Sequence, residues 1–348
     1  MTDVPHLMHA PDVMQAVVAE TKAGSLRLVQ VPTPHPGPGD MLVRVVASGV
    51  NPLDTKILAG TADHACQALP AILGIDMAGI VAGGETTKFQ AGDAVYGMAG
   101  GVGGHPGSLA EYMVADARLL ARKPANLSMR EAAALPLVFI TAWEGLIDRA
   151  AVRAGQHVLV QGGAGGVGQM VLQIARARGA TTTATGSPAS RTAIERLGAQ
   201  FADKAEPAAS IVARLTGGQG FDIVFDTAGG ASLDAAFAMV RRFGHVVSIL
   251  GWGTHALAPL SFRAASYSGV FTLLPLLTGE GRAHHGEILA EATGLAEAGG
   301  LVPTLDPRRF TLATVSDAYR AIESRTARGK LVVDVAEEAG WESRLARE

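Results

Sequence analysis

The residues best suited to chemistry form one glycine-rich sequence: Gly163, Ala164, Gly165, Gly166, Val167 and Gly168. This sequence matches the G-x-G-x-x-G pattern, follows an apolar run at 157–162 and opens an amphipathic helix predicted from about residue 166 to 178. In that context the first glycine makes a tight turn, the second lets the backbone approach a pyrophosphate, and the third lets helix and strand pack closely. The N–H groups and dipole of the helix N-terminus favour phosphate. We therefore predict a dinucleotide-binding loop, the alternative being a strand-to-helix turn without a ligand.

The residues after this loop bear on which dinucleotide binds. An NAD site usually has an acidic residue about 20 positions further on, which binds the ribose hydroxyls. The chain has no acidic residue from Gln169 to Ile194, and the end of the second predicted strand is followed by Ser187, Ser190 and Arg191. A carboxylate there would repel a 2′-phosphate, whereas serine and arginine can donate to it. We therefore predict NADPH as the cofactor; the alternative for Arg191 is a solvated position on a helix.

The elements that must position these residues fall into two patterns. From Ala16 to about Pro124, short apolar runs alternate with turn residues, which predicts an all-β, barrel-like region. After Ser128, strands alternate with helices, which predicts a doubly wound parallel sheet in an α/β protein. The segment after Glu280 is too short to form a domain alone. We predict these boundaries: a β-barrel domain at 14–130 completed by 275–335, a nucleotide-binding domain at 131–274, and loose termini at 1–13 and 336–348.

Composition excludes several classes of protein. Of 348 residues, 48% are apolar and 18% charged, which excludes disorder, and a net charge of −3 gives no sign of a nucleic-acid partner. Cys66 is the only cysteine, so neither an intrachain disulfide nor a four-cysteine metal site can form. The longest apolar runs are shorter than the ~20 residues of a membrane span. Residues 1–13 lack the apolar centre of a secretory signal, so we expect a cytoplasmic protein without membrane partners.

Five motifs carry a resemblance to a known family: NPLDTK (51–56), LGIDMAG (73–79), AGDAVYG (91–97), TAWEGL (141–146) and VQGGAGGVGQ (160–169). Together they resemble the zinc-free quinone oxidoreductase branch of the medium-chain dehydrogenase/reductase superfamily, over about Gln15 to Val335. The resemblance implies a GroES-like catalytic domain and a Rossmann domain. It also implies dimers or tetramers, in zinc-free members often homodimers joined through the edge strand of the Rossmann sheet, which we expect near Val270–Leu274.

The positions that bind zinc in other branches of this superfamily hold different residues here. The matching positions are Asn51, Ile75 and Leu137. Isoleucine and leucine cannot ligate zinc, and one asparagine cannot hold it. We therefore predict no metal. Without a Lewis acid, hydride transfer from NADPH to a quinone or to the β-carbon of an enone is favoured, because the conjugated carbonyl spreads the developing negative charge.

The resemblance also assigns residues to the site. Asn51 is similar to a family residue near nicotinamide and substrate, and Lys56 stands where several relatives carry a tyrosine, so these two are the candidate catalytic residues. Thr141, Gly251 and Lys330 are the further candidates for cofactor contacts. The alternatives are a turn residue for Asn51, a solvated helix end for Lys56 and a helix-interior position for Thr141.

We expect a zinc-independent NADPH-dependent oxidoreductase acting on a quinone, an enone or a related carbonyl. Two other functions stay open. One is an NAD-dependent alcohol or aldehyde dehydrogenase, which bound metal and cofactor preference would reveal. The other is a non-catalytic NADPH-binding sensor or structural protein, which a test of NADPH consumption with a panel of acceptors would separate from an enzyme.

Overall fold

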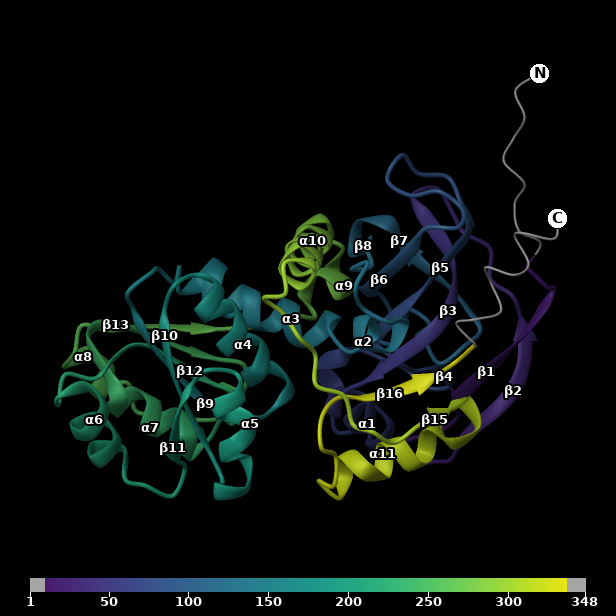
Figure 1. Cartoon of the computed structure of the whole chain (residues 1–348). Helices are drawn as coiled ribbons and strands as arrows, with labels where there is room; N and C mark the ends of the chain where they lie inside the picture. Colours follow the sequence, from purple (N-terminus) through teal and green to yellow (C-terminus); the bar gives the residue numbers. More distant parts are fainter. Residues whose placement is uncertain (1–9, 337–348) are drawn as a thin grey trace. The chain divides into compact units, whose positions relative to one another are not determined.

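The computed structural model describes residues 10–336 of the chain, which form two compact units (Figure 1). One unit contains the residues up to Leu137 and those from Leu273 onward, and the other is Val138–Thr272. These divisions differ by a few residues from the domain boundaries that we predict from the sequence. The reason is that the first helix after Ser128 packs on strands of the first unit. The predicted loose termini lie mostly outside the described residues.

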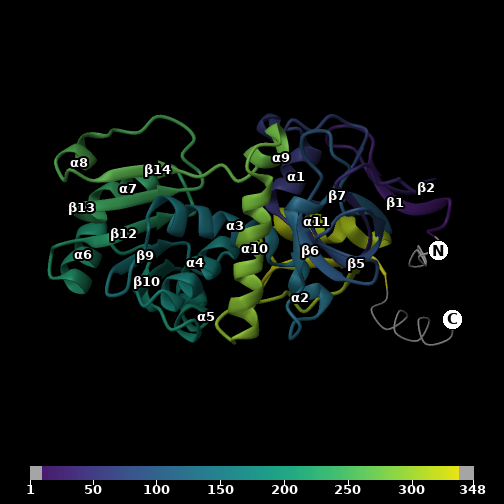
Figure 2. The same cartoon turned by 90° about the horizontal axis from the view of Figure 1, so that it is seen from above.

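The first unit is a β-structure with helices around it. Its elements are β1 (Val13–Ala19), β2 (Leu26–Pro32), β3 (Asp40–Val50), α1 (Pro52–Ala59), η1 (Asp63–Ala65), β4 (Ala71–Ile72), β5 (Asp76–Gly84), β6 (Ala94–Met98), β7 (Tyr112–Asp116), η2 (Ala117–Leu119), β8 (Leu120–Arg122), α2 (Met129–Ala133), α9 (Leu274–Thr278), α10 (Arg282–Glu297), β15 (Phe310–Thr311), η5 (Leu312–Thr314), α11 (Val315–Glu323) and β16 (Leu331–Asp334). Strands β2-β1-β4 form one sheet and β15-β16-β3-β5-β6-β8 the other, with β7 also pairing with β3. Helix α10 packs along β8 and η2 and also contacts β6, beside which it lies in Figure 2.

The long strand β3 organises this unit. Register shifts between Leu42 and Val43 and between Val45 and Ala47 bend it, as β-bulges do. Its first half pairs with β7 and its second half with β16, while β5 pairs along its length. Because Leu331 lies opposite Val50 in this register, the C-terminal return of the chain is brought against the end of β3. Buried side chains of β3, β5, β6 and β7 form the core around it.

The second unit is a doubly wound α/β domain, as predicted. Its elements are η3 (Glu144–Arg149), β9 (His157–Gln161), α4 (Gly166–Ala177), β10 (Thr181–Gly186), η4 (Pro188–Ser190), α5 (Arg191–Arg196), β11 (Gln200–Asp203), α6 (Ala208–Thr216), β12 (Phe221–Asp226), α7 (Ala231–Met239), β13 (Val240–Ser248), α8 (Ala258–Ser261) and β14 (Ser266–Gly269), and α3 (Pro136–Trp143) leads into it. The strand order is β11-β10-β9-β12-β13-β14, with every pair parallel. The order reverses between β9 and β12, and in such sheets ligands bind outside the carboxyl ends of the strands at that point.

The predicted edge strand near Val270–Leu274 is wrong in position. The edge strand is β14, which pairs with β13 through Gly269. One further hydrogen bond, from Val270 N to Ser248 O, follows, and α9 begins at Leu274. Within the apolar run 270–274, Val270 and Leu273 are buried, whereas Phe271 and Leu274 are exposed. No helix within residues 10–336 is long and apolar enough to cross a membrane.

Candidate functional site

The glycine loop joins β9 to α4 through a sharp turn. Gly162 has a φ of +80°, and Gly165 N donates to Gly162 O at 2.9 Å. Gly165 is the N-cap of α4, and the first helical hydrogen bond runs from Gln169 N to Gly165 O. The three N–H groups between them therefore have no acceptor within the helix. They form the donor set that the sequence predicts for phosphate.

The three glycines of the motif have different surroundings. A Cβ on Gly163 would lie 2.3 Å from the Cβ of Ala184, and one on Gly168 would lie 2.3 Å from the carbonyl oxygen of Gly162. A Cβ on Gly165 would meet only that carbonyl oxygen, at 3.2 Å. Gly163 and Gly168 therefore allow close packing, while Gly165 leaves open the space above the helix N-terminus. This cradle fits the pyrophosphate of a dinucleotide.

Backbone and side-chain groups at the ends of neighbouring strands hold the loop in place. Gly163 N donates to Thr185 O at 3.1 Å, and the Thr185 hydroxyl accepts from Gly162 N at 3.3 Å. On the other side, the Thr227 hydroxyl donates to Gln161 O at 2.7 Å. The loop is thus held between the carboxyl ends of β10 and β12, at the point where the strand order reverses.

The predicted phosphate-binding residues lie at the end of β10. Ser187 is the N-cap of η4, and the Ser190 hydroxyl donates to Ser187 O at 2.7 Å. Arg191 begins α5 with its side chain 56% exposed. Its guanidinium lies 4.2 Å from the centre of the Phe201 ring and 3.5 Å from Glu195 Oε1. These residues are gathered at one strand end, as predicted from their spacing.

Two charged residues near this strand end were missed by the sequence reasoning. Asp203 lies opposite Gly186 in the parallel register, and its carboxylate accepts from Ala205 N at 2.9 Å. The exposed Lys204 donates its backbone N–H to Gly186 O at 3.0 Å. Asp203 ends β11, which pairs with β10, and Lys204 directly follows it. The parallel pairing of the second and third strands of the α/β pattern is the signal that could have found them.

The remaining predicted cofactor contacts of this unit are spread over other elements. Thr141 is nearly buried on α3. Gly251 is exposed after β13, and a Cβ there would lie 2.1 Å from the hydroxyl of Tyr267. The buried Asp226, at the end of β12, accepts from Gly229 N and from the Ser248 hydroxyl, which fixes the two strand ends beside the loop.

In the first unit, Asn51 belongs to a buried polar network. It is the N-cap of α1, and its backbone N–H donates to Asp54 Oδ2 at 2.7 Å. Its side-chain Nδ2 donates to Asp76 Oδ2 at 2.9 Å, while its Oδ1 accepts from Lys330 Nζ at 2.5 Å. Lys330 also donates to Val50 O at 3.2 Å and lies 3.8 Å from Asp76 Oδ2. Pairing of β16 with the end of β3 creates this network.

Burial controls the protonation of the network. Burial, opposed by the hydrogen bond from Asn51 N–H and by the charge of Lys330 and helped by the nearby Asp76, raises the pKa of Asp54 to about 7. Burial also raises the pKa of Asp76 and lowers the pKa of Lys330. Asp54 Oδ1 and the hydroxyl of Tyr319 on α11 are both buried without a hydrogen-bond partner among the described residues. Burial therefore shifts Asp54, Asp76 and Lys330 toward their neutral forms.

The network includes two of the residues that were predicted to meet cofactor or substrate, Asn51 and Lys330. Both side-chain groups of Asn51 are bonded inside it, and Lys330 has its ammonium turned into it, with 12% of the side chain exposed. Lys56, by contrast, lies on the exposed face of α1. The two candidate catalytic residues thus occupy different environments on one helix.

The expected zinc positions do not fit a metal ion. Ile75 is fully buried, and Leu137 contributes its backbone N–H to Asp76 Oδ1 at 2.9 Å. Neither side chain has a donor atom. Within the part of the chain that the structure describes, no group of three or more His, Cys, Asp or Glu side chains could hold a metal.

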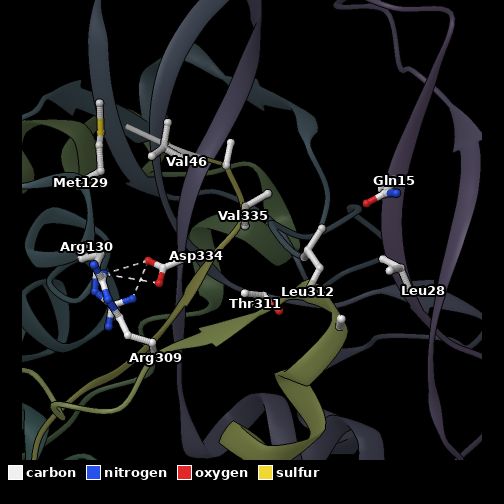
Figure 3. Close-up of a pocket in the computed structure, with 12 residues that line it drawn as sticks. Gln15, Leu28, Val46, Met129, Arg130, Arg309, Thr311, Leu312, Asp334 and Val335 are labelled. Carbon is white, nitrogen blue, oxygen red and sulfur yellow. Dashed lines mark hydrogen bonds and ion pairs between the residues drawn. The ribbon is translucent and has the colours of Figure 1, made fainter. Parts of the chain in front are cut away.

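The first unit also contains a cavity of about 590 Å³, outlined by β1, β2, β3, α2 and the C-terminal return (Figure 3). Arg130 and Arg309 both reach Asp334, and Arg130 Nη1 donates to its Oδ1 at 2.5 Å. Val46 and Leu312 line an apolar part of it. Because the carboxylate ties α2 to β16, this ionic cluster stabilises the return of the chain.

Comparison with known proteins agrees with this geometry. Residues 37–125 match the alcohol dehydrogenase GroES-like domain, and residues 197–333 match the zinc-binding dehydrogenase family. The chain is 34% identical over 311 residues to a 2-methylene-furan-3-one reductase of Solanum lycopersicum, covering 84% of this chain and 71% of that protein. It is 33% identical over 302 residues to the chloroplastic NADPH-dependent alkenal/one oxidoreductase of Arabidopsis thaliana, again covering 84% and 71%.

A solved structure extends the similarity to the whole fold. An alcohol dehydrogenase superfamily protein from Novosphingobium aromaticivorans is 54% identical and superimposes with a TM-score of 0.91, covering 93% of this chain and 100% of that one. The two-domain architecture, the glycine loop and these relatives together show that the chain belongs to the medium-chain dehydrogenase/reductase superfamily and is an oxidoreductase of that family.

Proposed function

We propose that this chain is a zinc-independent, NADPH-dependent reductase of conjugated carbonyl compounds, with enones and alkenals as its first substrate class and quinones as its second. The observation that carries the proposal is the open phosphate cradle of α4, beside a strand end that offers Ser187 and Arg191. The names of the tomato and Arabidopsis relatives support reduction of enones and alkenals, the latter with NADPH.

Each group has a task that follows from its position. The N–H groups of the first turn of α4 bind the pyrophosphate, and Arg191 neutralises the 2′-phosphate. When bound, NADPH supplies a hydride. Lys56, exposed on α1, is the proposed donor toward the negative charge that develops on the carbonyl oxygen. Asn51 holds the end of β3 and the start of α1 through its bonds to Asp76 and Lys330.

The donor set argues against a zinc mechanism. Ile75 and Leu137 offer only hydrocarbon where zinc-containing relatives carry ligands, so polarisation of the carbonyl is left to hydrogen-bond donors. Conjugated acceptors suit such a site better than simple alcohols, because delocalisation already spreads the developing charge.

We also propose a homodimer joined through β14. This strand pairs with β13 on one side and is the last strand of its sheet, so its other edge is open to a second copy. Light scattering of the purified chain is expected to give twice the monomer mass. Val270 N donates to Ser248 O, so the N–H groups of Tyr267 and Gly269 point away from β13. Gly269→Pro removes one donor of this open edge and is expected to give monomers, and a monomeric wild type would contradict this arrangement.

The function is tested by following NADPH oxidation with a panel of enones, alkenals, quinones and saturated aldehydes. Turnover is expected with the conjugated acceptors and not with the saturated ones. NADH at the same concentration is the control for cofactor choice. Oxidation of simple alcohols with NAD, or no turnover with any acceptor, would contradict the proposal.

A further inference from the structure

The guanidinium of Arg191 rests on an aromatic ring. Its central carbon lies 4.2 Å from the centre of the Phe201 ring, well inside the ~6 Å range of cation–π attraction. Phe201 is 7% exposed and belongs to β11, so the ring is fixed by the core beneath it. The Arg191 side chain is 56% exposed above the ring. One face of the guanidinium is thus held, while the arginine is still accessible from solvent.

The sheet register brings this ring close to the end of β10. Phe201 lies opposite Ala184, and Asp203 lies opposite Gly186. The chain then passes through Ser187–Ser190 and returns to Arg191. Because the ring stands two register positions before the strand end, it keeps the guanidinium near that end instead of extended into solvent.

Glu195 competes for the same cation. It lies one helical turn after Arg191, with 3.5 Å between Arg191 Nη1 and Glu195 Oε1. This distance is long for a charge-assisted hydrogen bond, and both side chains are more than half exposed. The pair is therefore weak, and an incoming phosphate with its larger charge can displace the carboxylate.

We propose that Phe201 is a positioning residue that sets the preference for NADPH by holding Arg191 ready for the 2′-phosphate, while Glu195 opposes this preference. The inference rests on the proposed function, because it assumes that Arg191 meets the cofactor phosphate. It assigns a selectivity role to a side chain that contacts the cofactor only through another residue.

The test compares Phe201→Leu, Phe201→Tyr and Glu195→Gln by calorimetric titration with NADPH and with NADH. Leucine keeps the apolar side chain but removes the ring, so NADPH is expected to bind about 2–5-fold more weakly, with NADH unchanged. Tyrosine keeps the ring and is expected to match the wild type within about twofold. Glu195→Gln is expected to tighten NADPH by about twofold without changing NADH.

A double variant separates a positioning role from a structural one. In the Arg191→Ala background, Phe201→Leu is expected to have no further effect on NADPH, because the ring then has no cation to hold. An unchanged NADPH-to-NADH ratio in Phe201→Leu, an equal loss of both cofactors, or an undiminished effect in the Arg191→Ala background would overturn the inference.

The wild type and Arg191→Ala distinguish the two possible failures. If the wild type binds NADPH and NADH equally, the proposed cofactor preference fails. If the wild type prefers NADPH and Arg191→Ala loses that preference while Phe201→Leu keeps it, only the role of Phe201 is wrong.

Discussion

The two units hold their polar groups in opposite ways. In the first, the buried Asn51, Asp54 and Asp76 and the mostly buried Lys330 are bonded mainly to one another. In the second, the glycine loop leaves the N–H groups at the start of α4 without intrahelical acceptors and with open space before them. A buried polar group must be hydrogen-bonded to offset its desolvation cost. An exposed donor is hydrogen-bonded to water, which a ligand can replace. We therefore expect the first arrangement to contribute mainly to stability and the second mainly to binding.

The largest expected effect tests the closed network. Lys330→Met leaves Asp76 and Asn51 Oδ1 without their cationic partner, so the free energy of unfolding is expected to fall by about 3–5 kcal/mol. Urea unfolding measures this change. The matched control is Lys56→Met on exposed α1, which is expected to change stability by less than about 0.5 kcal/mol. Equal free energies of unfolding for the two variants would show that the network does not stabilise the fold.

The next effect tests the open loop. Gly165→Val fills the cradle with a branched side chain, and NADPH binding is expected to weaken at least about 100-fold, since several hydrogen bonds to charged phosphate are lost. The melting temperature is expected to stay near that of the wild type, because a Cβ here meets only Gly162 O at 3.2 Å.

Gly168→Ala is the contrasting variant, because its Cβ would lie 2.3 Å from the same carbonyl oxygen. It is expected to lower the melting temperature. Unchanged NADPH affinity in Gly165→Val would refute the assignment of the loop to phosphate.

A smaller effect concerns the choice of cofactor. Arg191→Ala is expected to weaken NADPH by about 10–100-fold while barely changing NADH, which has no phosphate at that position. Arg196→Ala, in the last turn of the same helix, is the control. Ser187→Asp is expected to reverse the preference by repelling the phosphate and accepting from the ribose hydroxyls. Loss of both cofactors in Arg191→Ala would indicate a structural role instead.

A pH-dependent effect returns to the network. Because the pKa of Asp54 rises from 3.8 to about 7 on folding, the stability that it contributes is fully present below pH 3.8 and is lost as the pH rises toward 7. Within that window the loss is at most about 1.4 kcal/mol per pH unit. Asp54→Asn lacks this titration, so its stability relative to the wild type is expected to increase from pH 5 to pH 7.

Urea unfolding at several pH values tests this expectation, with the exposed Asp63→Asn as the control. Parallel pH profiles for Asp54→Asn and the wild type would contradict a raised pKa of Asp54 in the folded protein.

Removal of metal is expected to have no effect. Treatment with a zinc chelator is expected to leave reductase activity unchanged, because Ile75 and Leu137 cannot ligate a metal. Elemental analysis is expected to find well below one zinc per chain. Stoichiometric zinc together with chelator-sensitive turnover would contradict the metal-free interpretation, because the polar groups of the first unit would then bind a ligand as well.

The glycine loop could be predicted because its requirements are local. The strand, the six residues of the loop and the helix are adjacent in the sequence. Each glycine is required there because a larger side chain would collide with neighbouring atoms or fill the space before the helix. The edge strand could not be placed in the same way. The apolar run at 270–274 has the composition of a strand, but it follows the sheet and leads into α9, and the more polar Ser266–Gly269 forms the edge.

The sequence alone determined the two-domain α/β architecture, the glycine loop between a strand and a helix, the lack of zinc ligands at the expected positions and the absence of an acidic residue from Gln169 to Ile194. Only the tertiary structure decided which polar groups are already bonded. Asn51 and Lys330 are 279 positions apart, and the pairing of β16 with β3 joins them. Phe201 reaches Arg191 in the same way, through the pairing of β11 with β10. Hydrogen bonds and ring contacts act over a few ångströms, so the fold must place the partners before their chemistry is defined.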